Sequence, residues 1–170
     1  MEGGVTEANA RNHPPLSIAL EDPAGADARR CLAAYFAELA ERFEEGFDAG
    51  GAGHRIGAEF APPHGAFFVA RLAGEAAGCG GFVTMDAETA EIKRVWTSPA
   101  ARGLGVARAL LTALEAEARA RGFRRLRLDT NRALKEAQTM YQKAGYRDIE
   151  RYNENPYAHR WFEKALWTDD

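Results

Sequence analysis

The chain has 170 residues, of which 46% are hydrophobic and 28% are charged, and its formal net charge is -3. This composition is typical of a folded globular protein and excludes a disordered or fibrous chain. The small negative charge argues against a protein whose main task is to coat nucleic acid or an anionic membrane. The length fits one domain, which we expect over residues 16–170 behind a flexible tail at 1–15.

Charge is distributed unevenly along the chain. Residues 1–60 carry 5 basic and 11 acidic side chains, whereas residues 91–170 carry 16 basic and 11 acidic ones. An anionic ligand is therefore expected in the second half.

Cysteine usage and hydropathy indicate a reduced, cytoplasmic setting. Cys31 and Cys79 lie among apolar and small residues without metal-ligand spacing, so we expect neither a disulfide framework nor a metal site. No apolar run approaches the ~18 residues that a membrane helix needs, and the N-terminus lacks the pattern of a secretory signal. We expect no membrane or nucleic-acid partner, and a homodimer is left open.

The first half of the chain predicts a strand, a helix and two further strands. LSIAL (16–20) is a short strand, and apolar residues at three- to four-residue intervals predict a helix over 27–45. Segments 66–74 and 76–85 predict two strands joined by a tight turn. The second of them is rich in glycine, which lets another backbone come close.

The next strand, AEIKRVWT (90–97), contains an irregularity. Its alternation of side chains slips between Ile92 and Val95. Such a slip is what a β-bulge produces.

The remaining elements alternate helices with strands. A helix over 104–121, a strand over 124–130 and a helix over 133–144 are followed by a hairpin of 146–152 and 158–166, with a turn at Asn153–Pro156. This order predicts an α/β fold with a mixed sheet and helices on its faces.

The turn before the helix at 104–121 carries the clearest functional signal. Gly103 and Gly105 lack a Cβ, so their amides can approach a ligand closely, and the helix N-terminus adds unpaired N–H groups and a positive dipole end. Arg102 adds a formal charge suited to a phosphate. Together these features predict an anion site.

The spacing of this turn excludes the common nucleotide motifs. The Gly-Lys-Ser/Thr ending of a Walker A loop is missing, and Arg108 stands where a dinucleotide fingerprint has its third glycine. The pattern present is Arg-x-x-Gly-x-Ala, formed by Arg102, Gly105 and Ala107. By itself this pattern is also compatible with a core helix that simply begins at a glycine-containing turn and binds no ligand.

Two adjacent segments together resemble the GNAT superfamily of acyl-CoA-dependent N-acetyltransferases. AEIKRVWTSPAARGLGVARALL (90–111) is similar to the family's fourth strand, pyrophosphate loop and third helix. RLRLDTNRALKEAQTMYQKAGY (125–146) is similar to the next strand and helix, with the ending Ala-x-x-x-Tyr-x-x-x-Gly-Tyr. The resemblance implies a mostly antiparallel sheet splayed into a V, with helices on both faces and acetyl-CoA as co-substrate.

The same resemblance implies which residues contact acetyl-CoA. Main-chain groups of Val95 and Thr97 face the pantetheine arm, and Asn131 and Tyr141 lie near its thioester end. The amides of the turn hold the pyrophosphate, namely those of Arg102, Gly103, Leu104, Gly105, Val106 and Ala107.

The chemistry of acetyl transfer to a primary amine assigns further roles. An alkyl amine has a pKa of about 10.4 and must lose a proton before it attacks, and Glu91 stands where the family often places its general base. An N–H of Val95 or Trp96 is expected to stabilise the oxyanion, and Tyr141 to protonate the leaving thiolate. A surface carboxylate at Glu91 and a packing aromatic at Tyr141 are the alternative interpretations.

The acceptor is the least defined element. We expect a small-molecule or peptide amine, which the acidic residues around the first helix could attract, although a solvated helix face explains them too. Those residues are Glu38, Glu41, Glu44, Glu45 and Asp48. Tyr157, His159 and Trp161 of the last hairpin could line the same cleft.

Two other functions remain open at this level. The chain could be an acyl-CoA-binding sensor without turnover, or a small Rossmann-like nucleotide-binding domain with Asp129 on a ribose.

Overall fold

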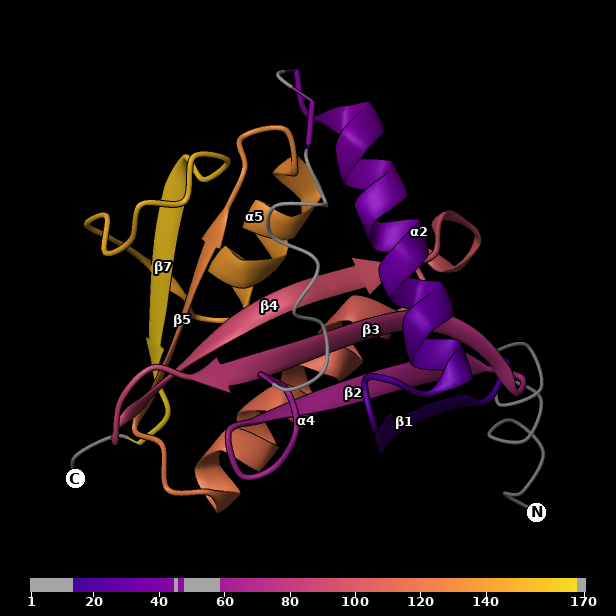
Figure 1. Cartoon of the computed structure of the whole chain (residues 1–170), viewed down its shortest axis with the longest axis horizontal. Helices are drawn as coiled ribbons and strands as arrows, with labels where there is room; N and C mark the ends of the chain where they lie inside the picture. Colours follow the sequence, from indigo (N-terminus) through magenta and orange to yellow (C-terminus); the bar gives the residue numbers. More distant parts are fainter. Residues whose placement is uncertain (1–13, 45, 48–58, 168–170) are drawn as a thin grey trace, which may run out of the picture.

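The computed structural model describes residues 14–44, 46–47 and 59–167. Within these ranges it contains a seven-stranded sheet in the order β1-β2-β3-β4-β5-β7-β6 (Figure 1). All neighbouring strands are antiparallel except β4 and β5, which are parallel. The strands are β1 (Leu16–Leu20), β2 (Gly65–Leu72), β3 (Glu75–Thr84), β4 (Thr89–Thr97), β5 (Arg125–Thr130), β6 (Arg147–Ile149) and β7 (Arg160–Ala165).

Helices cover both faces of this sheet. The helix α2 (Ala26–Arg42) crosses one face, and α4 (Val106–Ala120) and α5 (Lys135–Lys143) lie on the other (Figure 1). Alternation along β2 divides the core between them, because Phe67 and Val69 pack with α2 whereas Ala66, Phe68 and Ala70 pack with α4. The predicted mixed α/β fold is confirmed. None of the helices described is long and apolar enough to cross a membrane.

The two central strands separate soon after they meet. β4 pairs with β5 only from Thr89 to Glu91, opposite Arg125 to Arg127. Beyond Glu91, the edge of β4 that faces β5 has no strand to pair with in the part of the chain described. The sheet is therefore open between β4 and β5, as the V-shaped arrangement requires.

A β-bulge on the other side of β4 lies beside this opening. The pairing of β3 with β4 shifts between Cys79 and Gly81, which face Trp96 and Lys93, so that Gly80 stands opposite two residues of β4. Arg94, one of these two, has a φ of 60°. The bulge predicted between Ile92 and Val95 is confirmed.

Glycine allows β3 to lie close to β4. A Cβ at Gly78 would lie 2.6 Å from the main-chain oxygen of Trp96, a distance that side-chain carbons do not tolerate. The glycine-rich character of this strand is thus explained by the close approach of a neighbouring backbone.

The C-terminal hairpin differs from its prediction. β6 and β7 pair as expected, but β6 ends at Ile149 and the connection covers residues 150–159. The predicted strand extended to Tyr152. In the structure Tyr152 and Asn153 instead hydrogen-bond to Glu91 and Asp129, so this segment lies outside the sheet and contacts the carboxylates in the opening between β4 and β5.

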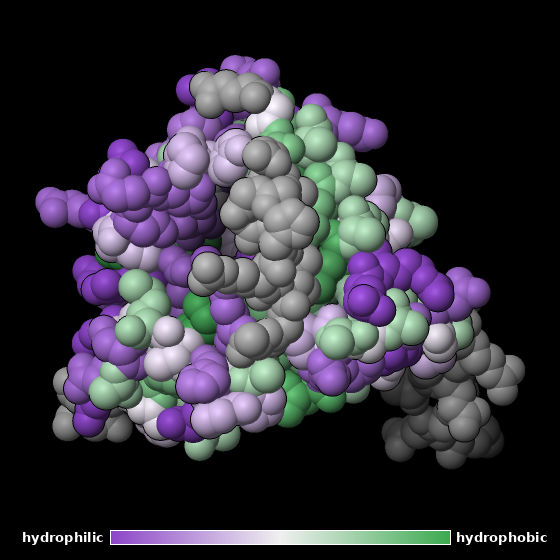
Figure 2. Space-filling model, in the orientation of Figure 1, coloured by the Kyte–Doolittle hydropathy of each residue, from purple (hydrophilic) through white to green (hydrophobic). Residues whose placement is uncertain are grey.

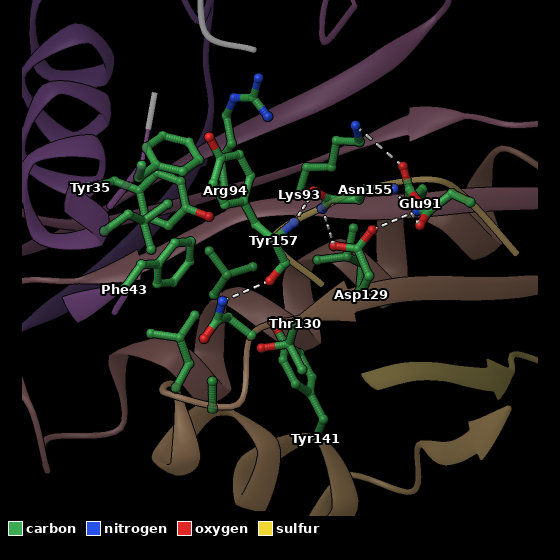
Figure 3. Close-up of a pocket in the computed structure, with 18 of the residues that line it drawn as sticks. Tyr35, Phe43, Glu91, Lys93, Arg94, Asp129, Thr130, Tyr141, Asn155 and Tyr157 are labelled. Carbon is green, nitrogen blue, oxygen red and sulfur yellow. Dashed lines mark hydrogen bonds and ion pairs between the residues drawn. The ribbon is translucent and has the colours of Figure 1, made fainter. Parts of the chain in front are cut away.

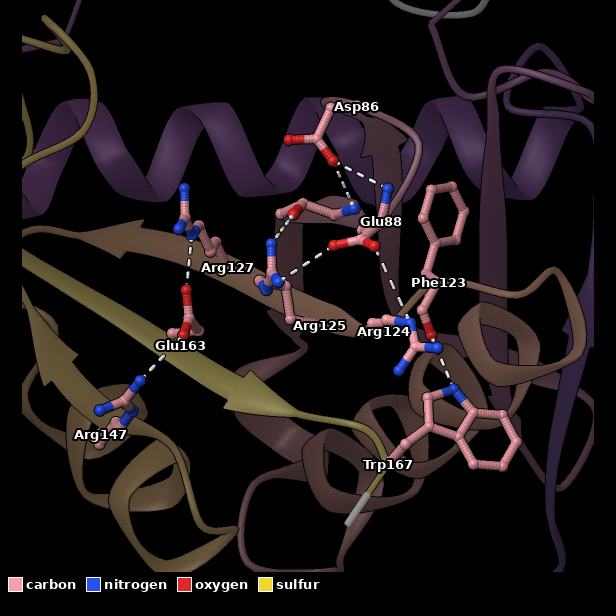
Figure 4. Close-up of polar contacts among 10 residues, drawn as sticks. Asp86, Glu88, Phe123, Arg124, Arg125, Arg127, Arg147, Glu163 and Trp167 are labelled. Carbon is pink, nitrogen blue, oxygen red and sulfur yellow. Dashed lines mark hydrogen bonds and ion pairs between the residues drawn. The ribbon is translucent and has the colours of Figure 1, made fainter. Parts of the chain in front are cut away.

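Ion pairs tie β7 to the strands on either side. Glu163 of β7 accepts a hydrogen bond from Arg127 of β5 at 2.7 Å and one from Arg147 of β6 at 3.1 Å (Figure 4). Burial alone would raise the pKa of the Glu163 carboxyl, but the bonds from the two guanidinium groups outweigh it and hold the pKa below its ordinary value.

We expect this ion pair to contribute to stability only while Glu163 is ionised. Because its pKa is lowered in the folded state, the contribution is present above the ordinary glutamate pKa of about 4.3 and is lost as the pH falls through the lower folded value. Denaturant unfolding of Glu163→Gln between pH 3 and 7 should show a smaller loss of stability toward acid than the wild type. Glu88→Gln, which removes a more exposed partner of Arg125, is the control. Equal acid sensitivity of wild type and Glu163→Gln would contradict the assignment.

Candidate functional site

The opening between β4 and β5 contains two cavities that meet. The loop cavity, of about 410 Å³, extends toward the turn before α4, and the carboxylate cavity, of about 490 Å³, extends toward Glu91 and Asp129. Both are lined by the same junction residues, Tyr35, Leu39, Val95, Leu134 and Ala137. A single ligand can therefore extend from one cavity into the other.

The N-terminus of α4 forms one end of the loop cavity. Gly105 is the N-cap residue with a φ of 84°, Gly103 has a φ of 82°, and no side chain caps the helix. A Cβ at either glycine would meet no atom within 4 Å, so the positive φ, and not crowding, accounts for glycine here. The first amides of α4 lack intrahelical partners and are suited to bind an anion, so we call this position the anion seat.

Basic side chains stand beside this seat and are held by acidic ones. Arg102 forms an ion pair with Glu38 of α2. Arg42, also of α2, lies 2.5 Å from Glu136 of α5 and donates a 2.9 Å hydrogen bond to the Ala133 carbonyl oxygen. These contacts connect α2 with the turn and with α5 across the loop cavity.

The side of β4 contributes buried polar atoms without partners. Thr97 Oγ1 and Trp96 Nε1 are both buried and have no hydrogen-bond partner among the described residues. Both residues line the loop cavity. Since an unpartnered buried polar group costs free energy, these atoms are explained if a ligand hydrogen-bonds to them.

Glu91 lies at the apex of the opening and is held in a defined position. Its side chain lines the carboxylate cavity and the residue is 8% exposed. Oε2 accepts a 2.6 Å hydrogen bond from the Tyr152 hydroxyl, and Oε1 lies 3.4 Å from the ammonium group of Lys93 (Figure 3). Burial and the negative charge of Glu91 raise the pKa of Tyr152, so the phenol keeps its proton and remains a donor.

Asp129 of β5 provides a second carboxylate in the same cavity. It accepts hydrogen bonds from the side-chain amides of Asn153 at 2.6 Å and Asn155 at 3.1 Å. The Asn153 amide also lies 3.5 Å from Glu91 Oε2, and its oxygen accepts a bond from the indole of Trp161. The loop after β6 thereby fixes both carboxylates from one side.

Two tyrosines approach the junction from opposite faces of the sheet. Tyr141 of α5 is 5% exposed, packs on Tyr146 and Phe162, and also lines the carboxylate cavity. Burial raises the pKa of Tyr141 and raises that of Tyr35 to about 12, so both phenols are protonated near neutral pH.

The residues predicted to contact a ligand mostly gather around this opening. The loop cavity is lined by Val95, Trp96, Thr97, Arg102, Gly103, Gly105, Val106 and Ala107, whereas Glu91, Asn131 and Tyr141 line the carboxylate cavity. Leu104 is 46% exposed and lines neither cavity. The Asn131 side chain is occupied by main-chain partners, the Tyr157 carbonyl oxygen and the Ala133 amide.

The predicted acidic band does not face the cavity as a group. Glu38 pairs with Arg102 and Arg42, and Glu44 pairs with Arg132. Glu45 and Asp48 lie outside the described residues, as does most of the predicted tail at 1–15.

Sequence reasoning missed several residues that line the carboxylate cavity. Tyr152, Asn153 and Asn155 belong to a segment that was interpreted as strand and turn, and the aromatic residues of α2 were interpreted as core. Their only signal was the density of asparagine and tyrosine after β6, which turn propensity explains equally well.

The acetyltransferase (GNAT) family model matches residues 32–146, about two thirds of the chain. The chain belongs to the GNAT acetyltransferase family. Its fold contains the open V and the uncapped helix N-terminus at the positions that the two sequence motifs predicted. The mostly antiparallel sheet shows that the alternative of a Rossmann-like domain was wrong. Asp129, which that alternative placed on a ribose, accepts hydrogen bonds from two asparagine amides instead.

Individual relatives agree with this membership. The chain is 39% identical over 90 residues to an IAA acetyltransferase of Azospirillum brasilense, covering 52% of this chain and 58% of the relative. It is 32% identical over 94 residues to the uncharacterized N-acetyltransferase YjgM of Escherichia coli, covering 54% and 56%. The matches thus span little more than half the length of these curated relatives.

A solved structure extends the similarity of fold to nearly the whole chain. The crystal structure of an aminoglycoside 6'-N-acetyltransferase complexed with coenzyme A superposes with a TM-score of 0.69 at 15% identity, covering 91% of this chain and 99% of that one. Within the described residues of this chain, no group of histidine, cysteine, aspartate and glutamate side chains could hold a metal ion.

We expect the Tyr152 hydroxyl to stabilise the fold through Glu91. Tyr152→Phe removes a short hydrogen bond to a buried carboxylate and should lower the free energy of unfolding by about 1.5–3 kcal/mol. Tyr146→Phe is the control, because its hydroxyl lies 3.4 Å from Glu115 and should contribute less. Denaturant unfolding measures both, and an equal or smaller effect of Tyr152→Phe would contradict the geometry.

Proposed function

We propose that this GNAT protein transfers an acetyl group from acetyl-CoA to a primary amine by direct attack of the amine on the thioester. The observation that supports this best is the pair of connected cavities, with an anion seat at one end and a fixed carboxylate at the other. Each end suits one of the two substrates, and the junction is where they would meet.

The residues of the loop cavity fit coenzyme A. The uncapped amides of α4 and the positive-φ glycines suit a pyrophosphate, and Arg102 can add charge once it leaves Glu38. Thr97 Oγ1 and the unpaired edge of β4 offer hydrogen bonds to the amide groups of a pantetheine arm. Bound there, acetyl-CoA supplies the activated acetyl group.

Glu91 would act on the acceptor as the general base. An alkyl ammonium ion with a pKa of about 10.4 must give up a proton to become nucleophilic. Since Tyr152 occupies Oε2, the oxygen available to take this proton, directly or through water, is Oε1. Lys93 is partly exposed, so its ammonium group can shift from Oε1 as the acceptor arrives while it stays in the lining of the cavity.

The remaining steps concern charge on oxygen and sulfur. As the amine nitrogen bonds to the carbonyl carbon, negative charge develops on the carbonyl oxygen, which a main-chain N–H of Val95 or Trp96 beside the bulge can stabilise. The carbon–sulfur bond then breaks as the carbonyl re-forms, and Tyr141, whose phenol is protonated near neutral pH, would give its proton to the departing sulfur. The phenolate would recover a proton from the nitrogen, which must lose one to become an amide. The products are the acetamide and free CoA.

A thiol-release assay tests the proposal against a sensor that binds acyl-CoA without turnover. We expect release of CoA thiol that requires both acetyl-CoA and an amine, together with a mass increase of one acetyl group on the amine. Thermal stabilisation by CoA without thiol release from any primary amine would favour the sensor.

Tyr141→Phe should lower kcat by about 10²–10⁴-fold while the dissociation constant of CoA changes little. The variant keeps the packing on Tyr146 and Phe162 and loses only the proton donor. Tyr146→Phe, which changes a neighbouring tyrosine absent from both cavities, should leave kcat unchanged. Steady-state kinetics decide between the acid and packing roles, since an unaltered kcat for Tyr141→Phe leaves only packing.

Glu91→Gln should impair the reaction most where the acceptor is protonated. Below the amine's pKa a base is needed, so the ratio of wild-type to variant kcat/KM should be large near pH 7 and should shrink as the pH approaches about 10. A ratio that stays constant over this range would argue against base catalysis by Glu91.

A further inference from the structure

We propose that the acceptor is a monoamine whose single ammonium group is attached to an aromatic or similarly flat apolar group. This inference rests on the proposed function, and it concerns the two unlike walls of the carboxylate cavity. One wall is aromatic and belongs mainly to α2 and the segment after it. The other is polar and belongs to β4, β5 and the loop after β6.

The aromatic wall is a continuous group of rings. Phe47 stacks on Phe36 with centroids 5.8 Å apart and contacts Tyr157 at 4.8 Å, and Phe43 contacts both Phe47 and Tyr157. All four line the carboxylate cavity, and Phe36, Phe47 and Tyr157 are only half-buried. Their rings therefore offer apolar surface to a ligand, and a flat apolar group gains most from such contacts.

The polar wall lies opposite these rings. Figure 3 shows Tyr35 and Phe43 on one side of the pocket and Glu91, Asp129 and Asn155 on the other. On the molecular surface, hydrophilic residues gather on the side of β5 and β7 and a strip of hydrophobic residues lies on the side of α2 (Figure 2). An acceptor that bridges the walls must be polar at one end and apolar at the other.

The formal charges of the cavity indicate one positive charge on the acceptor. Its described lining contains three carboxylates, those of Glu59, Glu91 and Asp129, and two basic groups, those of Lys93 and Arg94. Among these described groups one negative charge is in excess, which a single ammonium group would neutralise. A second or third ammonium group, as in a polyamine or an aminoglycoside, would meet Lys93 and Arg94 at close range and be repelled.

Arg94 reinforces this arrangement. Its guanidinium group lies 5.5 Å from the Phe36 ring centroid and 5.3 Å from that of Phe60, so it is held over aromatic faces at the bulge. Its positive charge therefore lies against the ring of Phe36, which belongs to the aromatic wall, and disfavours a second positive charge there. The ammonium group of the acceptor is thereby directed to Glu91, and the apolar group to the rings.

A panel of three amines tests the proposal. With acetyl-CoA saturating, kcat/KM for 2-phenylethylamine should exceed that for propylamine, which lacks the ring, and that for spermidine, which carries extra charges, by about 10-fold or more. Acetylation is followed by thiol release and by mass spectrometry. Equal or higher kcat/KM for spermidine or propylamine would overturn the inference while leaving the proposed function intact, and acetylation of no amine by a CoA-binding protein would overturn both.

Variants of the aromatic wall test whether its rings cause the preference for an aromatic amine. Phe47→Ala should lower kcat/KM for 2-phenylethylamine about 10-fold, mainly through KM, and should lower kcat/KM for propylamine much less. Phe47→Leu, which keeps more apolar volume, should lie between wild type and Phe47→Ala. Trp167→Ala removes an exposed aromatic residue that lines neither cavity and is the control.

Binding in the absence of turnover provides a second readout. Calorimetric titration of 2-phenylethylamine into the CoA complex should give weaker binding for Phe47→Ala than for wild type and for Trp167→Ala. Equal affinity in all three proteins, or an equal loss of kcat/KM for 2-phenylethylamine and propylamine in Phe47→Ala, would show that the rings do not bind the acceptor.

Discussion

The separation of β4 and β5 beyond Glu91 is the constraint on which both halves of the site depend. β4 stays paired with β3 through the bulge, whereas on its other side it pairs with β5 for three residues only. Pairing with β3 continues to Thr97, which the absence of a Cβ at Gly78 permits, so the opening lies on the side of β5. This geometry places one unpaired strand edge between the uncapped start of α4 and the carboxylates at the apex.

The charged groups near the loop cavity are fewer than the basic excess of the second half of the chain indicates. The basic excess of residues 91–170 predicted an anion site, yet several of these arginines are paired with acidic groups away from both cavities, as Arg127 and Arg147 are with Glu163 and Arg160 is with Asp148. The loop cavity is lined by the main-chain amides at the start of α4 and by three arginines, Arg42, Arg102 and Arg108. Arg42 and Arg102 are paired with Glu136 and Glu38. Oriented amides and a few nearby arginines, rather than the net charge of the second half of the chain, therefore make this place suited to an anion.

Local sequence patterns sufficed to predict the order of elements, the bulge and the turn before α4, because each follows from periodicity or from glycine at a fixed position. They did not reveal the polar wall of the carboxylate cavity. Tyr152, Asn153 and Asn155 reach Glu91 and Asp129 across more than twenty residues of sequence, and such contacts depend on how β6, β7 and β5 are ordered in the sheet. Glu38 belonged to an acidic band that was interpreted either as attracting a cationic acceptor or as a solvated helix face, and the structure pairs it with Arg102, 64 residues away.

We expect one ligand-binding path to run from the start of α4 to the junction beside Tyr35 and Tyr141. A crystal structure of the protein with CoA tests this most directly. The pyrophosphate should lie at the amides of residues 103–107, Thr97 should hydrogen-bond to the pantetheine arm, and the sulfur should lie at the junction between the two cavities. CoA bound elsewhere, or with its sulfur directed away from the carboxylate cavity, would contradict it.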